Sequence, residues 1–329
     1  MIILNASEPL KLADYLRSKR WLHHDETIRM ASIPGEGNMN FVLRIDTGYR
    51  SFIVKQSKDY VEKYPHVAAP ADRIVTEGAF YRKVSGHDTL QEFMPLLLGI
   101  DIENNVLVLE DLGNSRDFTR IYHKDEFISD DELIGLVHYL SALHESFFRD
   151  NSDAVFANKK MKILNHEHIF CYPFQKDNGF DLNTITPGLQ EVAIRYKTDG
   201  MLKTIVSKLG ECYLSEGNYL LHGDFYPGSW LLTKNGIKVI DPEFCFYGSR
   251  EFDLAIMQAH LILARQNQSV IDLIAKHYDA YDTLNKPIIR RMTGTEIMRR
   301  LIGLAQLPLD LSLDSKKQLL EQASQMIKQ

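Results

Sequence analysis

Short, mostly apolar runs, separated by glycine-bearing turns, fill the first third of the chain. The runs at 28–33, 41–45, 51–56 and 106–109 predict β-strands. One helix interrupts them at about 72–85, where Ile74, Tyr81 and Val84 recur at helical spacing. Beyond Gly113 helical periodicity dominates. The pattern predicts an α+β protein with a small β-rich N-terminal lobe that has one main helix, residues 1–112, and a larger, mostly helical C-terminal lobe, residues 113–329.

The C-terminal lobe is expected to contain several amphipathic helices and one irregular stretch. Helices are predicted from Asp130 to about residue 143 and over residues 252–264, 270–281, 296–306 and 315–328. The sequence Thr-Gly-Thr-Glu at 293–296 matches a capping box and predicts that one helix begins there. Residues 153–188 lack clear periodicity and are predicted to form an irregular insertion near the substrate side.

A candidate catalytic carboxylate follows the apolar run at 219–221. His222-Gly223-Asp224 places Asp224 directly after a predicted strand, where it can accept the proton of an attacking hydroxyl group. The alternative is that Asp224 only caps a turn. The motifs that follow it along the chain favour phosphoryl transfer.

Candidate magnesium ligands lie further along the chain. Residues 230–240 predict a strand, a turn and a second strand, and this hairpin is expected to bring Asp241 back beside Ser229. Asp241, Glu243 and Ser229 offer the hard oxygen ligands that Mg²⁺ prefers. The alternative is that Asp241-Pro242 simply starts a loop.

Phosphoryl transfer also needs a cation that binds the phosphates. Lys55 lies among apolar neighbours in the predicted strand 51–56, and Glu77 falls within the apolar stripe of the predicted helix. A buried carboxylate is costly unless it is paired. We therefore expect Glu77 to pair with Lys55; the alternative is a solvated strand lysine.

Two further segments suit a nucleotide. Gly35, Gly37 and Asn38 lie in a turn between predicted strands, where backbone N–H groups can contact phosphates. The same turn would serve any hairpin. The strand at 106–109 is followed by an acidic turn that contains Glu110 and Leu112. This turn suits a hinge whose backbone hydrogen-bonds an adenine, although an ordinary strand end is equally compatible.

Composition narrows the function classes. The chain has 329 residues, 44% of them hydrophobic and 25% charged, which is enough for a substantial core. A net charge of −6 and the lack of a basic run argue against nucleic acid as a partner. Cys171, Cys212 and Cys245 are widely spaced and odd in number, so neither a disulfide framework nor a zinc site is indicated. Without a signal peptide or a membrane-length apolar run, the expected location is the cytoplasm, with no membrane partner; a homodimer is left open.

Together these motifs resemble a known family. The strings His222-Gly223-Asp224, Gly228-Ser229, Ile240-Asp241-Pro242-Glu243 and Phe252-Asp253-Leu254 are similar to methylthioribose kinase, within the aminoglycoside phosphotransferase and choline kinase superfamily. Serine at 229, where most of that superfamily has asparagine, and Asp-x-Glu in place of Asp-Phe-Gly are features of that kinase. Further similarity at 35–40, 53–56, 109–112 and 298–305 extends the resemblance to both lobes.

The resemblance implies a bilobal protein-kinase-like fold and an ATP- and Mg²⁺-dependent kinase that phosphorylates a hydroxyl group of a small molecule. It implies that Asp224 is the catalytic base, that Asp241 and Glu243 bind magnesium, and that Lys55 binds phosphate. Arg299 and Arg300 would approach the sugar hydroxyls and the reacting phosphate. Adjacent helical residues point about 100° apart, so the alternative is that one of this pair forms a surface ion pair.

The acceptor is the least determined part of the resemblance. The family's tryptophan-bearing loop after the lysine strand corresponds to residues 60–73, which contain no tryptophan. A methylthioribose-like sugar is the leading candidate, and an aminoglycoside, a choline-like amino alcohol or another sugar would use the same ATP-binding residues. A catalytically silent nucleotide-binding protein of this fold is an alternative from another class. The presence of Lys55, Glu77, Asp224, Asp241 and Glu243 speaks against it.

Overall fold

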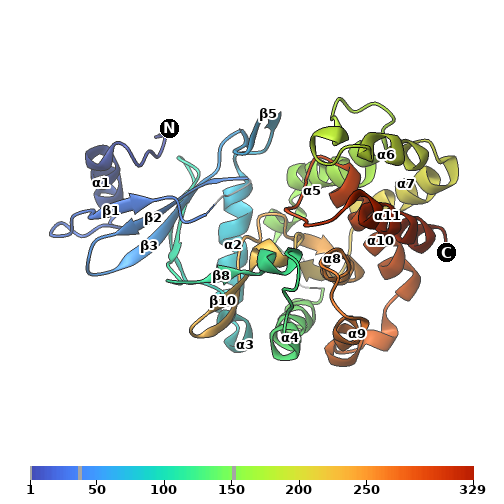
Figure 1. Ribbon diagram of the computed structural model, residues 1–329. Helices are drawn as coiled ribbons and strands as arrows, with labels where there is room; N and C mark the ends of the chain where they lie inside the picture. The colour runs from blue at the N-terminus through green and yellow to red at the C-terminus, as the bar shows by residue number, and fades with distance from the viewer. Residues whose placement is uncertain (1, 36–38, 150–152) are drawn as a thin grey trace. The chain divides into compact units, whose positions relative to one another are not determined.

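Each of the two structural units of the chain is built from two separate segments (Figure 1). The first unit comprises Met1–Arg116 and Thr233–Glu243, and the second comprises Asp117–Leu232 and Phe244–Gln329. The computed structural model describes residues 2–35, 39–149 and 153–329. No helix in these ranges is both long enough and apolar enough to cross a bilayer.

A five-stranded antiparallel sheet forms the centre of the first unit, in the order β1-β2-β3-β7-β6. Its strands are β1 (Met30–Ser32), β2 (Phe41–Asp46), β3 (Ser51–Gln56), β6 (Leu97–Asp101) and β7 (Val106–Glu110), and a separate hairpin consists of β4 (Tyr60–Val61) and β5 (Tyr64–Ala68). The four strands predicted from the short apolar runs are confirmed. Because β3 is paired on both sides, Lys55 is fixed opposite Val42 and Leu107.

Two helices, α1 (Pro9–Ser18) and α2 (Arg73–Ser85), cover opposite faces of this sheet (Figure 1). Val54 packs in a buried cluster with Leu12 of α1. Gly78 of α2 lies against Leu107, where an added Cβ would come within 3.3 Å of the Leu107 Cδ1. Side chains alternate along a strand, so Lys55 points to the α2 face. A short helix, α3 (Asp88–Gln91), follows α2.

The segment Thr233–Glu243 returns the chain to the first unit. It contains β11 (Gly236–Val239), which is preceded along the chain by β10 (Trp230–Thr233), so the predicted strand–turn–strand pattern is confirmed. Gly236 takes a φ of +95°, which a side chain would disfavour, and closes the turn. The N–H of Val239 donates to the Phe93 carbonyl at 2.6 Å. The residues after β11 are thereby held against the first unit.

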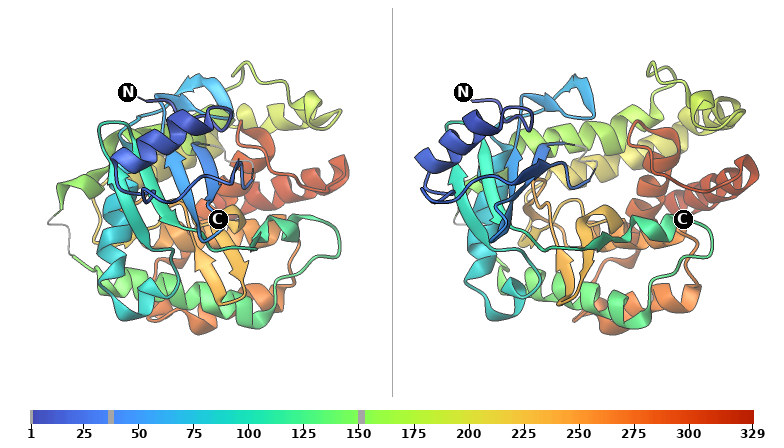
Figure 2. Two further views of the ribbon diagram at one scale, coloured as in Figure 1. Left: turned by 90° about the vertical axis from the view of Figure 1, so that its left-hand side faces the viewer. Right: turned by 60° about the vertical axis from the view of Figure 1, so that its left-hand side comes forward.

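The second unit is mostly helical. Its helices are α4 (Asp130–Ser146), α5 (Lys159–His166), α6 (Leu189–Lys197), α7 (Gly200–Leu214), α8 (Glu251–Leu263), α9 (Gln268–His277), α10 (Lys286–Ile302) and α11 (Leu313–Lys328). Its short strands β9 (Tyr219–Leu221) and β12 (Phe246–Gly248) pair antiparallel, and β8 (Arg116–Asp117) lies where the first unit ends. Helices α10 and α11 lie side by side (Figures 1 and 2), because Gly294 leaves room for the Ala323 carbonyl, 2.7 Å from where a Cβ would be.

The helices predicted at 130–143, 252–264, 270–281 and 315–328 are confirmed as α4, α8, α9 and α11. Two predictions are wrong. Helix α10 begins at Lys286 rather than at Glu296, because Asn285 caps it by accepting the N–H of Ile288 at 3.2 Å and Pro287 suits its first turn. Residues 153–188 contain α5 and the π-helical turn Glu167–Cys171. The buried face of α5 includes the polar Lys162 and Asn165, which hides its periodicity.

Candidate functional site

Lys55 of β3 lies between two carboxylates of the first unit. Its ammonium group is 2.8 Å from the Glu77 carboxylate and also bonds Asp241. The side chain of Glu77 is fully buried in the middle of α2, on the face that covers the sheet. The predicted pairing of Lys55 with Glu77 is confirmed.

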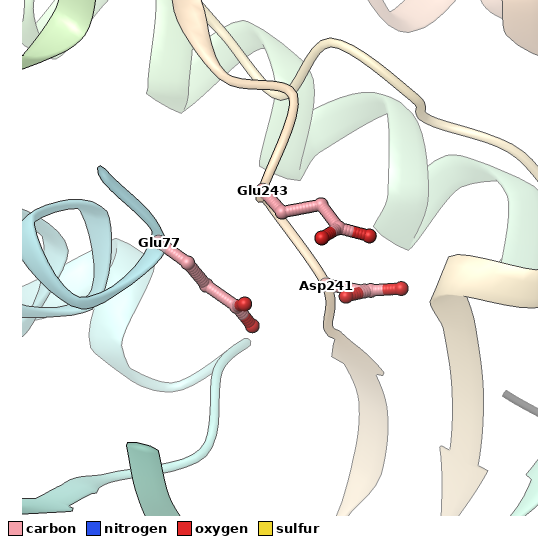
Figure 3. Close-up of side chains that lie close together, drawn as sticks. All are labelled: Glu77, Asp241 and Glu243. Atoms are coloured by element: carbon pink, nitrogen blue, oxygen red, sulfur yellow. The ribbon is translucent and has the colours of Figure 1, made fainter. Parts of the chain in front are cut away.

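Asp241 and Glu243 project from the segment that follows β11, and Glu77 reaches toward them from α2 (Figure 3). Carboxylate oxygens of the three residues lie within 4.8 Å of one another. Asp241 adopts the left-handed conformation, with a φ of +69°, and its N–H donates to the Tyr81 hydroxyl at 3.2 Å. A non-glycine residue in that region costs about 1–2 kcal/mol. The fold thus holds the Asp241 carboxylate in place against a local conformational preference.

Charge dominates the chemistry of this cluster. Burial works to lower the pKa of Lys55, but Asp241, Glu77 and Glu243 outweigh it and raise that pKa well above its ordinary value. Burial, opposed by Lys55 and reinforced by the other carboxylates, raises the pKa of Glu77 to about 8. Burial and then Asp241 also raise the pKa of Glu243. Three carboxylates, Glu77, Asp241 and Glu243, meet two cations, Lys55 and Arg73, and the Asp241 carboxylate is 42% exposed, which leaves room for a divalent cation to balance the remaining charge.

The donor set of Asp241 and Glu243 fits Mg²⁺. Both offer carboxylate oxygens, and Mg²⁺ in nucleotide sites is bound by one or two carboxylates together with substrate phosphates and water. Lys55 contacts both Glu77 and Asp241, but the Glu77 side chain is buried whereas that of Asp241 is 42% exposed, and Glu243 follows Asp241 on the same segment. Asp241 and Glu243 would therefore hold the metal, while Glu77 would hold the lysine.

The predicted nucleotide-binding backbone lies in the same unit. Gly35 lines a hollow of about 290 Å³ together with Asn40 and Phe41, and the other predicted residues of that turn, Gly37 and Asn38, lie outside the described part of the chain. Glu110 uses its side chain locally, accepting the N–H of Leu96 at 3.1 Å.

The segment predicted to form a hinge, which contains the half-buried Leu112, is held by an arginine. Arg44 of β2 donates to the Asp111 carboxylate and to the Gly113 carbonyl, each at 2.9 Å. The backbone around Leu112 is therefore clamped on both sides.

In the second unit Asp224 lies on a loop that is anchored by its backbone. Asp253 of α8 is fully buried and accepts the N–H groups of His222 at 2.7 Å and Gly223 at 3.0 Å. The Ser229 hydroxyl donates to the Asp224 carbonyl at 3.1 Å. These bonds fix the loop directly after β9 and leave the Asp224 carboxylate 20% exposed.

Two arginines flank that carboxylate. Arg299 Nη1 lies 3.9 Å and Arg300 Nη2 lies 3.5 Å from Asp224 Oδ1. Glu296, one helical turn earlier on α10, binds both: its Oε1 is 3.1 Å from Arg299 Nη1 and 2.6 Å from Arg300 Nε. Both arginines are buried, so the alternative of a surface ion pair for one of them is wrong.

A histidine completes this network. His260 Nε2 is 3.1 Å from Glu296 Oε1, and its Nδ1 is bonded to the Tyr122 hydroxyl. Burial, with Arg300 and Arg299, lowers the pKa of His260 to about 4, so the neutral ring donates to Glu296 and accepts from Tyr122. Burial raises the pKa of Asp224 above its ordinary value although Arg300 and Arg299 oppose it. A raised carboxyl pKa suits a proton acceptor.

The sequence did not predict the contacts of three buried charged residues: Arg73, Asp253 and Glu296, the last of which was predicted only as part of a capping box. Asp253 and Glu296 each interrupt an otherwise buried helical stretch. That interruption is a signal that a charge has a specific partner. The same signal led to Glu77.

Comparison with known proteins bears on this site. A model of the fructosamine kinase family matches residues 180–281, which include Asp224 and Asp241. A methylthioribose kinase from one strain of Bacillus cereus is 30% identical over 70% of this chain and 59% of its own length. That of a second strain of the same species is 26% identical over 89% of this chain and 86% of its own. The chain thus spans less than two thirds of the first relative and most of the second.

Solved structures show the fold. A choline kinase from Streptococcus pneumoniae superposes with a TM-score of 0.55, at 13% identity, over 97% of this chain and 98% of that one. A spectinomycin phosphotransferase in complex with ADP and spectinomycin also has a TM-score of 0.55, at 12% identity over 97% of both chains. The fold is that of protein-kinase-like phosphotransferases. The resemblance predicted from the sequence is confirmed.

Proposed function

We propose that the chain is an ATP-dependent small-molecule kinase that transfers the γ-phosphoryl group to a hydroxyl group of a methylthioribose-like sugar. The observation that carries the proposal is the set of charged side chains: Lys55 paired with Glu77 beside Asp241 and Glu243, and a separate loop carboxylate, Asp224. The methylthioribose kinases that the chain resembles support the choice of acceptor.

In this proposal each residue has a defined task. Asp224 accepts the proton of the acceptor hydroxyl group. The oxygen of that hydroxyl group bonds to the γ-phosphorus, and the bond between the γ-phosphorus and the ADP oxygen breaks. Lys55 would bind the phosphates, and Asp241 and Glu243, with Ser229, would hold a magnesium ion, which would supply positive charge to the phosphates. The turn with Gly35, Gly37 and Asn38 would cover the phosphates, and the backbone at Glu110 and Leu112 would bind the adenine.

The arginine pair favours a sugar over a cationic acceptor. Arg299 and Arg300 lie within 4 Å of the Asp224 carboxylate, at 3.9 and 3.5 Å. Because Glu296 holds both arginines beside Asp224, this loop carboxylate is already engaged by positive charge and is not free to attract the ammonium group of an aminoglycoside or a choline-like alcohol. Hydroxyl oxygens of a sugar would instead accept hydrogen bonds from them.

The test is ADP release by the purified full chain with MgATP against methylthioribose, other pentoses, choline and an aminoglycoside. We expect turnover with methylthioribose, and a loss of about 10²–10⁴-fold in Asp224→Asn with ATP binding retained. ATP binding without ADP release across the whole panel would refute the kinase. Turnover with choline or the aminoglycoside alone would refute the acceptor. We propose a reducing, cytoplasmic location with ATP available, which agrees with Cys171, Cys212 and Cys245 forming no disulfide in the described part of the chain.

A further inference from the structure

Arg73, the first residue of α2, is a fully buried arginine within the first unit, with none of its side-chain surface exposed. Its carboxylate partner is Glu243, whose Oε2 lies 3.2 Å from Arg73 Nε. A buried guanidinium group is costly unless its charge and donors are satisfied. The geometry around Arg73 satisfies both.

The guanidinium group joins several loops to one another. Nη1 donates to the carbonyls of Lys58 at 2.6 Å and Pro70 at 2.7 Å. Nη2 donates to the carbonyl of Met39 at 2.7 Å. Arg73 therefore ties the end of the glycine-bearing turn to the segments before β4 and before α2, and ties all of them to Glu243.

Asn40 completes the arrangement. Its Nδ2 donates to Glu243 Oε2 at 2.8 Å, and its Oδ1 accepts from Arg73 Nε at 3.0 Å. One oxygen of the Glu243 carboxylate thus accepts a hydrogen bond from Asn40 and forms an ion pair with Arg73. That contact sets the direction in which the rest of the carboxylate faces.

Helix α2 holds both members of the Asp-x-Glu pair. Arg73 and Glu77 are one helical turn apart and so lie on the same face of α2. Glu77 acts on Asp241 through Lys55, which contacts both, whereas Arg73 contacts Glu243 directly. A single helix face therefore orients the two candidate magnesium ligands.

We propose that Arg73 is a positioning residue for the metal site: it holds Glu243, with the help of Asn40, in the orientation that binds magnesium. The inference rests on the magnesium role proposed above for Glu243. Partners that orient a metal ligand typically affect metal affinity by about 10–100-fold when removed. Removing Arg73 has two opposite effects on metal affinity. It removes a positive charge that repels the metal ion, but it also leaves the Glu243 carboxylate without a fixed orientation, and we expect the second effect to be larger.

The test measures metal binding directly, by Mn²⁺ titration followed by electron paramagnetic resonance in the presence of a non-hydrolysable ATP analogue. We expect Arg73→Met to weaken Mn²⁺ binding by about tenfold, and Asn40→Ala to weaken it less because the guanidinium group remains. In a Glu243→Gln background, Arg73→Met should cause no further change, since its effect acts through the Glu243 carboxylate. A metal affinity that is unchanged or stronger in Arg73→Met would overturn the proposal, as would an equal effect in both backgrounds.

Arg50→Met is the matched control. Arg50 also pairs with a carboxylate in the first unit, Glu26, at 2.8 Å. We expect this variant to lower the thermal midpoint and to leave Mn²⁺ affinity unchanged; an equal loss of affinity would show that any lost arginine has the same effect and would overturn the proposal.

Arg73→Lys covers the case in which Arg73→Met does not fold. One ammonium group cannot reach Glu243 and the carbonyls on both sides together, so weaker binding is again expected, and wild-type affinity in this variant would overturn the proposal. Wild-type protein that binds no metal would refute the proposed magnesium role itself, and the Arg73 proposal with it.

Discussion

Replacing Glu296 with glutamine removes one buried negative charge and keeps the size of the side chain. The Glu296 carboxylate lies 3.1 Å from Arg299 Nη1, 2.6 Å from Arg300 Nε and 3.1 Å from His260 Nε2, with no exposed surface. Removing one partner of a buried ion pair costs about 3–5 kcal/mol, because the remaining charge is left uncompensated. We expect the unfolding free energy of the second unit to fall by about that amount.

The chain provides a fluorescent probe for this measurement. It has two tryptophans, Trp21 in the first unit and Trp230 in the second. In a Trp21→Phe background, urea unfolding followed by tryptophan emission reports on Trp230, which is fully buried. The matched control is Glu132→Gln, whose parent carboxylate pairs with Arg120 at 3.2 Å and is partly exposed. Because solvent still reaches this partly exposed pair, we expect it to contribute only about 1 kcal/mol.

Glu296→Gln should also change the kinetics. Asp224 would become the nearest carboxylate for both arginines, which already lie 3.5 and 3.9 Å away. Closer pairing would lower the pKa of Asp224, so we expect kcat to fall and the acid limb of its pH profile to move to lower pH. An unfolding free energy within about 1 kcal/mol of the parent protein, or a loss equal to that of Glu132→Gln, would refute the reasoning.

Three further outcomes are expected. Lys55→Met should raise the KM for ATP and lower kcat in a steady-state assay, because two carboxylates of the metal cluster lose their shared cation. Burial lowers the pKa of His260 from 6.5 to about 4, so its contribution to stability is complete above about pH 6.5 and is lost as the pH falls through about 4. As the pH is lowered from 6.5 to about 4, the thermal midpoint of the parent protein should therefore approach that of His260→Gln. Gly223→Ala should destabilise the second unit by at least about 2 kcal/mol in urea unfolding, because Gly223 has a φ of +86° and a Cβ would lie 2.1 Å from the Phe244 carbonyl oxygen.

Each of these outcomes has a contrary result. An unchanged KM for ATP in Lys55→Met would contradict a phosphate-binding role, and a pH-independent difference between the parent and His260→Gln would contradict the lowered histidine pKa. Gly200→Ala is the control for Gly223→Ala, because Gly200 begins α7 with open space around it. If both alanine variants had the same stability, backbone strain at Gly223 would not be the cause.

The local sequence pattern was sufficient to predict an element or a site residue where its buried partners lie close in sequence or on one face of a regular helix or strand. The strand at 51–56 was predictable from its short apolar run, and the helix after it from its period of about 3.6 residues. Lys55 and Glu77 followed because they are charged residues within those apolar patterns. The start of α10 was not, because the capping box at 293–296 lies inside a helix that Asn285 already caps. A local motif gives way when a stronger cap and tertiary packing extend the helix past it.

Contacts between residues far apart in sequence could not be predicted from the sequence pattern. Arg73 begins a helix, where an exposed basic residue would be unremarkable, and its burial depends on Glu243, which is distant in sequence. Asp253 likewise has its partners 30 and 31 residues away, at the N–H groups of Gly223 and His222. Neither contact has a periodic signature, because it depends on which loops the fold brings together.

The return of the segment Thr233–Glu243 to the first unit has a consequence for how the protein is made. Lys55 and Asp241 are 186 positions apart in the sequence. At a synthesis rate of about 5–20 residues per second, the ribosome adds Asp241 roughly 10–40 s after it adds Lys55. During that interval Lys55 has Glu77 alone, and Arg73 lacks its carboxylate. The nascent first unit therefore lacks Asp241 and Glu243, the partners of Lys55 and Arg73, until most of the second unit has been translated. Stalled chains that end before Thr233 should be more sensitive to protease than the finished protein.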